Sequence, residues 1–98
     1  MSNKRKGTNG ERKTMRLLEA VGYTTMRAPA SLGVWDVGAW RTNVPGVRAI
    51  QVKCNRAPGP AEREAMELAP LPPDSTREYW VWKDYAREPV IVTLMERR

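Results

Sequence analysis

Hydrophobic and polar positions follow a helical period near the start of the chain. Within residues 8–22, apolar residues recur at helical intervals, and a glycine follows the last of them. Thr8 and Glu11 have the spacing of a capping box, in which each side chain bonds the other residue's backbone N–H. The pattern predicts an amphipathic helix over 8–22 that begins at Thr8.

In the segments that follow, hydrophobic and polar residues alternate with a period of two. Residues 23–28, 34–40 and 47–54 alternate and are rich in residues that favour strands, which predicts three strands. Residues 41–46 carry an Asn and a Pro-Gly pair, which are typical of a hairpin connection. We therefore expect a meander in which 34–40 and 47–54 are antiparallel neighbours.

The second half of the chain repeats both patterns. Pro60 stands where the first turn of a helix accepts proline, and good helix formers follow it, so a helix is predicted over 59–69. Alternation over 78–85 and 90–94 predicts two further strands. The expected order of elements is αβββαββ, which is an α/β fold.

Length and composition limit the size of the core. Ninety-eight residues, 41% of them hydrophobic, suit one compact domain over 1–98, with a basic N-terminal segment at 1–7. A core of this size gives modest stability. Burial of one face against a second copy would add to it, which makes a homodimer plausible.

The charge balance favours a polyanionic partner. The chain has 17 Lys and Arg against 11 Asp and Glu, a net charge of +6 and a pI near 10.0, which points to nucleic acid. A solvated basic tail is the alternative interpretation of the N-terminal charge. The cations concentrated there are Lys4, Arg5, Lys6, Arg12, Lys13 and Arg16.

Missing residue types restrict the chemistry. The chain has no His and one cysteine, Cys54, which excludes an internal disulfide, a His/Cys zinc site and a His general base. Carboxylates, amides, Lys and water remain. No apolar run is long enough for a signal peptide or a membrane span, so we expect a cytoplasmic protein without a membrane partner.

Four polar residues are candidates for one site. Gln51 and Lys53 are two apart on a predicted strand and share a face. If the neighbouring strands pair, Asp36 comes close to Gln51. Glu11 lies at the N-terminal end of the helix stripe that faces the core. Simple alternatives are a helix cap for Glu11 and a solvent-facing strand edge for Gln51 and Lys53.

The order and spacing of these residues resemble a known family. The segments are RKGTNGER (5–12), GYTTMRAPAS (22–31), GVWDVGAW (33–40) with its Asp, and AIQVK (49–53). Together they are similar to the archaeal-type Holliday junction resolvases of the PD-(D/E)xK nuclease superfamily. The resemblance covers the first half of the chain. It implies a restriction-endonuclease-like fold, with a central mixed β-sheet flanked by helices.

The resemblance also implies roles for the candidate residues. Asp36 would be the central metal ligand, with Gln51 and the backbone carbonyl of Val52 beside it, and Glu11 would reach the metal directly or through water. Lys53 would hold the attacking water and offset charge on the phosphate. Contacts to the scissile phosphate would come from Ser31 and Arg27. Apart from the resemblance, Arg56 is a further candidate for DNA contact, and a solvated position is its alternative.

Two departures from the family pattern are visible. Trp35 stands where a Pro usually precedes the central Asp. Gln51 stands where the family usually has a second acid, and an amide oxygen can coordinate a metal but brings no charge. The site would have one negative charge fewer and is expected to bind Mg²⁺ more weakly.

The implied function is Mg²⁺-dependent cleavage of branched double-stranded DNA. Mn²⁺ could substitute for Mg²⁺, because hard divalent cations with oxygen ligands activate water for phosphodiester hydrolysis. The expected enzyme is a homodimeric endonuclease that resolves four-way junctions by paired nicks, a crossover junction endodeoxyribonuclease. Two alternatives remain open: a related PD-(D/E)xK endonuclease of other specificity, and a non-catalytic basic nucleic-acid-binding protein.

Overall fold

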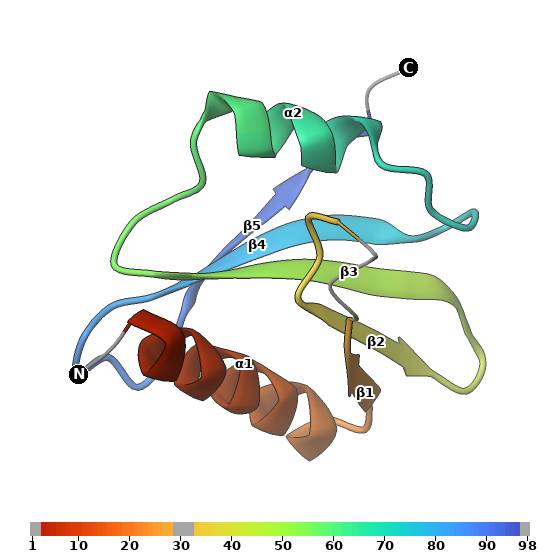
Figure 1. Ribbon diagram of the computed structural model, residues 1–98. Coiled ribbons are helices and arrows are strands. Elements are labelled where there is room, and N and C mark those ends of the chain that lie inside the picture. The colour runs from red at the N-terminus through yellow and green to blue at the C-terminus, as the bar shows by residue number, and fades with distance from the viewer. Residues whose placement is uncertain (1–2, 29–32, 97–98) are drawn as a thin grey trace.

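The computed structural model describes residues 3–28 and 33–96, with side chains in the first helix from Asn9 onward. The order of its elements confirms the predicted αβββαββ arrangement (Figure 1). No helix in these ranges is long and apolar enough to cross a membrane. The elements are α1 (Asn3–Ala20), β1 (Thr24–Arg27), β2 (Val37–Arg41), β3 (Val44–Cys54), α2 (Pro60–Leu68), β4 (Thr76–Trp82) and β5 (Val90–Leu94).

The strands form one mixed sheet in the order β1-β2-β3-β4-β5. β1, β2 and β3 are antiparallel neighbours, which confirms the predicted meander. β3 and β4 run parallel, whereas β5 returns antiparallel to β4. A parallel pair needs a crossover connection, because the chain must return to the edge where the first strand began. α2 is that connection.

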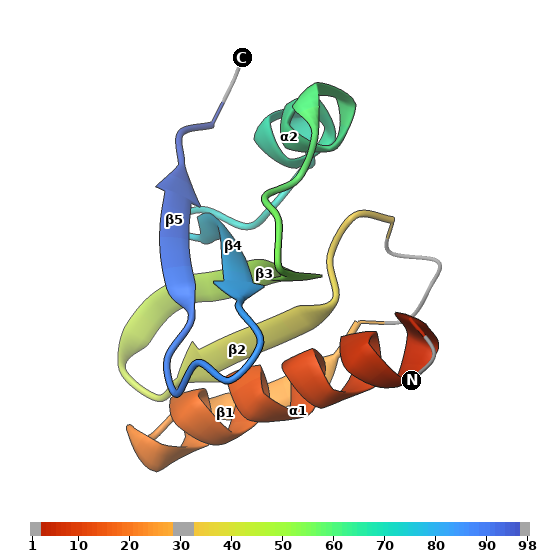
Figure 2. The same ribbon diagram turned by 90° about the vertical axis from the view of Figure 1, so that its left-hand side faces the viewer.

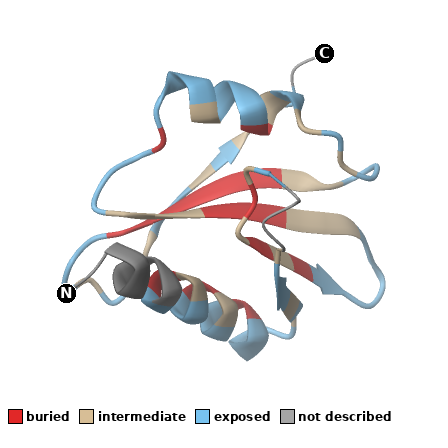
Figure 3. Cartoon of the chain, in the orientation of Figure 1, coloured by how far each residue is buried: buried red, intermediate tan, exposed pale blue. Residues whose placement is uncertain are grey.

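The two helices cover opposite faces of the sheet (Figure 2). Leu18 of α1 belongs to a buried cluster with Ile50, and Met66 of α2 belongs to a second cluster with Ala49. Neighbouring residues of a strand point to opposite faces, so β3 contributes to both clusters. Much of the buried surface therefore lies on the central strands β3 and β4 (Figure 3).

The first helix begins earlier than predicted. α1 starts at Asn3, so Thr8 lies inside the helix and the expected capping box of Thr8 and Glu11 is wrong. The residues before Thr8 are mainly Lys, Arg and Asn. Lys and Arg are good helix formers, and they extend the helix beyond its apolar stripe. Glu11 therefore does not cap the start of α1.

The hairpin between β2 and β3 is tighter than predicted. Arg41 pairs with Val44, so the turn is Thr42 and Asn43, and the Pro-Gly pair lies inside β3. Asn43 adopts a φ of 71°, a left-handed conformation that Asn tolerates. Gly46 has a φ of 78°, and a Cβ there would lie 2.3 Å from the backbone oxygen of Asp74. The glycine permits this close backbone approach.

A partly buried ion pair joins β3 and β4. Arg48 donates to both oxygens of Glu78, from Nε at 2.8 Å and from Nη2 at 2.7 Å. Thr76 Oγ1 and Trp80 Nε1 also donate to this carboxylate. Burial raises the pKa of Glu78, but these hydrogen bonds and the charge of Arg48 outweigh burial and bring the pKa below its ordinary value.

Glu78→Gln should destabilise the protein by about 2 kcal/mol at pH 7, because Arg48 would lose a charged partner. A carboxyl with a lowered pKa stabilises the folded state above its unfolded pKa, and that contribution is lost as pH falls through the folded pKa. The difference from wild type should therefore shrink in acid. Urea unfolding at several pH values measures it. The exposed control Glu88→Gln should change stability by less than about 0.5 kcal/mol, and a pH-independent difference for Glu78→Gln would contradict this explanation.

Candidate active site

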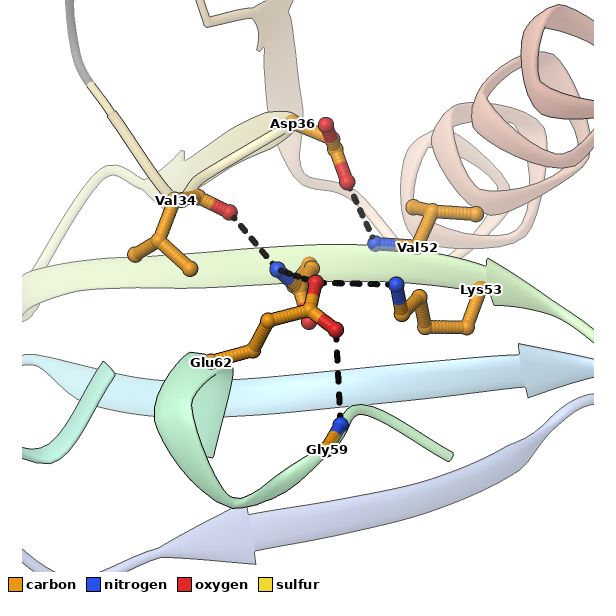
Figure 4. Close-up of polar contacts among 7 residues, drawn as sticks. Val34, Asp36, Val52, Lys53, Gly59 and Glu62 are labelled. Atoms are coloured by element: carbon orange, nitrogen blue, oxygen red, sulfur yellow. Dashed lines mark hydrogen bonds and ion pairs between the residues drawn. The ribbon is translucent and has the colours of Figure 1, made fainter. Parts of the chain in front are cut away.

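Asp36 is held at the point where β2 meets β3. It immediately precedes β2, although a strand over 34–40 was predicted. Its N–H donates to the carbonyl of Ile50 at 2.9 Å, and its Oδ2 accepts from the N–H of Val52 at 2.8 Å (Figure 4). The side chain of Asp36 thus accepts the hydrogen bond from a backbone N–H of β3, and β2 begins at the next residue, Val37. The bond fixes one carboxylate oxygen of Asp36.

The close approach of α1 to β3 brings Glu11 to the same region. A Cβ added at Gly10 would lie 3.0 Å from Cγ1 of Val52, so a side chain there would require the contact to widen by a few tenths of an ångström. Thr14 anchors the next turn of α1, because its hydroxyl accepts from Trp82 Nε1 at 2.9 Å and donates to the carbonyl of Gly10 at 2.8 Å. The close contact at Gly10 and the buried hydrogen bonds of Thr14 therefore fix the position of Glu11 on α1.

Glu11 and Asp36 repel each other. Burial raises the pKa of Glu11, the charge of Asp36 raises it further, and Arg27 lowers it in part. Burial also raises the pKa of Asp36, while the Val52 N–H and the charge of Lys53 oppose the rise. Arg27 Nε lies 3.3 Å from Glu11 Oε1. Burial is thus the main cause of both raised pKa values, and the charge of Asp36 adds to the rise at Glu11.

The side chains of Gln51 and Lys53 extend from one face of β3, as their spacing predicted, and this is the face that α2 covers. Lys53 Nζ donates to Glu62 Oε2 at 2.9 Å. Gln51 Nε2 lies 3.3 Å from Glu62 Oε2 and 3.3 Å from the carbonyl oxygen of Val34. Gln51 is 6% exposed, and its Oε1 is buried with no hydrogen-bond partner in the structure. The simple interpretation of a solvent-facing strand edge is therefore wrong for these two residues.

Glu62 is the residue that sequence reasoning missed. It lies in the first turn of α2, and its Oε1 accepts from the N–H of Gly59 at 3.3 Å, which is the Glu half of a capping box. Its charge raises the pKa of Asp36. The sequence signal for Glu62 was an acid in the first turn of the crossover helix, because that helix must pass the end of β3. Residues 59–69 alone have the pattern of an ordinary helix start.

The structure describes part of the remaining predicted contact residues. Ser31 lies outside the described residues, as do the side chains of Lys4, Arg5 and Lys6, whose backbone belongs to α1. Arg27 contacts Glu11. The carbonyl of Val52 as a metal ligand stays a prediction. Exposed cations are Arg12, Lys13, Arg16 and Arg56, of which Lys13 Nζ lies 5.3 Å from the ring centre of Trp82.

The donor set fits a hard divalent cation in kind. Mg²⁺ prefers carboxylate and carbonyl oxygens and keeps several waters. Glu11 and Asp36 supply carboxylates whose mutual repulsion a cation would relieve, and Gln51 Oε1 is a further oxygen without a partner. In the described part of the chain, no three Asp, Glu or Cys side chains already form a metal-binding group. Glu11 is paired with Arg27, and Glu62 with Lys53.

Comparisons with known proteins identify the fold and the family of the chain. Hjc from Archaeoglobus fulgidus, a Holliday junction resolvase from an archaeal hyperthermophile, superposes with a TM-score of 0.62 at 19% identity, over 92% of this chain and 72% of that chain. This likeness confirms the predicted restriction-endonuclease-like fold. No curated protein matches the chain. The family model of the archaeal Holliday junction resolvases (Hjc) matches residues 2–59. Because that match spans more than half of the chain, the protein belongs to the archaeal Holliday junction resolvase family.

Proposed function

We propose that the protein is a Mg²⁺-dependent endonuclease that resolves four-way DNA junctions by paired nicks. The observation that supports this proposal is the electrostatic interaction of Asp36, just before β2, with Glu11 of α1 and Lys53 of β3. The charge of Asp36 raises the pKa of Glu11 and the charge of Lys53 lowers the pKa of Asp36, while burial is the main cause of the raised pKa of both acids. Membership of the resolvase family supports the substrate.

Each side chain has a distinct part in this function. Asp36 and Glu11 would hold the cation, with Gln51 Oε1 and the Val52 carbonyl as further candidate ligands. When bound, Mg²⁺ supplies Lewis-acid activation of water and neutralises charge on the phosphate. Lys53, which is 20% exposed, would orient the attacking water and offset charge on the phosphate oxygens.

The exposed cations of α1 would bind the DNA backbone. Arg12, Lys13 and Arg16 lie on the helix that also carries Glu11, so phosphate contacts along α1 would bring a strand toward the acids. Because these contacts neutralise phosphate charge, the affinity for DNA should fall steeply with salt. Contacts to phosphate do not read the base sequence, so the shape of the junction would select the substrate.

Two nicks at a four-way junction require two active sites. A two-fold homodimer would present identical sites to two strands of a symmetric junction. One domain with a single Asp36 site cannot cut both strands at once. We therefore include the homodimer in the proposal.

Cleavage of a labelled synthetic four-way junction, compared with a linear duplex of equal length, tests the function. We expect symmetric nicks in the junction with Mg²⁺ or Mn²⁺, no cutting with EDTA, and little cutting of the duplex. Equal cutting of both substrates would instead indicate an endonuclease of other specificity. Tight binding to both without cleavage would favour a non-catalytic DNA-binding protein.

A further inference from the structure

We propose that Glu62 supplies the second acidic group of the active site, in place of the acid that position 51 lacks. Gln51 would then be a positioning residue for Glu62. This inference rests on the proposed metal-dependent function. It assigns to α2 a role in the chemistry beyond linking β3 to β4.

The contacts of Glu62 divide between its two oxygens. Oε1 accepts from the N–H of Gly59, which is a helix-capping contact. Oε2 faces Lys53 Nζ at 2.9 Å and Gln51 Nε2 at 3.3 Å, and these contacts are shown in Figure 4. A cap needs only one oxygen. The second oxygen is directed to the residues of the candidate site.

The orientation of the Gln51 amide explains why an amide suits position 51. Its Nε2 lies between two acceptors, the carbonyl of Val34 and the carboxylate of Glu62. Turning the amide over would place Oε1 against both acceptors and leave no donor for either. An acid at position 51 would likewise face the Glu62 carboxylate and repel it. Gln51 and Glu62 therefore form a matched pair that carries one negative charge.

The carboxylate of Glu62 is accessible from solvent. The Glu62 side chain is 43% exposed and can receive a hydrated cation. In the described residues, Glu11, Asp36 and Glu62 do not already form a three-acid group, but with Glu62 as a ligand the site would regain the negative charge that Gln51 does not supply.

The start of α2 is fixed by the chain, which keeps Glu62 in position. Pro58 is buried, Gly59 is extended with φ −74° and ψ 174°, and Pro60 occupies the first helical position. Proline at that position is already restricted to a helical φ. Glu62 follows within the same turn, so its direction relative to Lys53 is set by a rigid segment.

The test uses Glu62→Gln, because Gln at this position can still cap the helix while losing the charge. EPR of free Mn²⁺ measures Mn²⁺ binding by the full chain without DNA. The Mn²⁺ affinity of Glu62→Gln should be about tenfold or more lower than that of wild type, since affinity follows ligand charge. Glu64→Gln is the matched control, with the same change in the same helix, and should bind Mn²⁺ as wild type does. Equal affinities of the two variants would overturn the proposal.

A charge swap tests the pairing of positions 51 and 62. Gln51→Glu combined with Glu62→Gln returns the acid to the strand and leaves an amide on the helix, so it should recover most of the Mn²⁺ affinity lost by Glu62→Gln. Failure to recover would overturn the pairing. Junction cleavage is measured in parallel: a wild type that binds Mn²⁺ through Glu62 but does not cut would contradict the proposed function and leave this inference standing.

Discussion

Asp36→Asn is expected to lower the single-turnover rate of junction cleavage by about 1,000-fold, a loss of roughly 4 kcal/mol of transition-state stabilisation. The amide keeps an oxygen that can accept from the Val52 N–H but removes the negative charge of the central candidate ligand. Binding to the junction in EDTA should be retained, because phosphate contacts come from other residues. Asp84→Asn, an exposed site in the connection between β4 and β5, is the control and should cut normally.

Thermal unfolding without metal distinguishes loss of chemistry from loss of fold in this variant. Folding raises the pKa of Asp36, chiefly through burial, so the ionised carboxylate costs stability as pH rises through its folded pKa. Asp36→Asn removes that cost and should unfold at a higher temperature than wild type at pH 7, with a smaller gain in acid. An inactive variant that also unfolds at a lower temperature would contradict this explanation. Undiminished cleavage would place the metal site elsewhere.

Arg77→Met is expected to reduce the free energy of unfolding by about 3 kcal/mol. Arg77 is 4% exposed, and its Nη1 donates to the carbonyls of Met66, Glu67 and Ala69 at 2.6, 3.1 and 2.9 Å. These carbonyls end α2 and have no helical partner of their own. Methionine would fill much of the space but leave them buried and unpaired, which is costly.

Urea unfolding measures this effect, with Arg63→Met on the exposed side of α2 as the control. The control should change stability by less than about 0.5 kcal/mol. Because α2 also carries Glu62, Arg77→Met should weaken Mn²⁺ binding under conditions where the protein is still folded. A loss of stability below about 1 kcal/mol would show that the bonds from Arg77 are dispensable.

The elements of the fold were predictable because each has its own period. Alternation in 47–54 and the helical spacing in 8–22 reflect burial against one neighbour, and burial leaves a pattern in the chain. Two boundaries failed for local reasons. Charged helix formers extended α1 back to Asn3, and Asn43 made a two-residue turn that moved the Pro-Gly pair into β3.

The candidate site was predictable only in part. Asp36 immediately precedes β2, and Gln51 and Lys53 lie on the neighbouring strand β3, so pairing of the two strands brings the three residues to the same part of the sheet. The spacing could not show that Gln51 turns its amide donor toward Glu62. That orientation depends on an acceptor from another element.

The sequence by itself determined the order of elements, the excess of positive charge and the presence of an acid, an amide and a lysine near one another, because periodicity and composition are local properties. Only the tertiary structure decided which groups meet. α1 brings Glu11 to Asp36 because Gly10 lets the helix approach β3. The crossover of α2 places Glu62 on Lys53 and Gln51. Such meetings depend on how helices pack across a sheet, and no pattern within one segment records that packing.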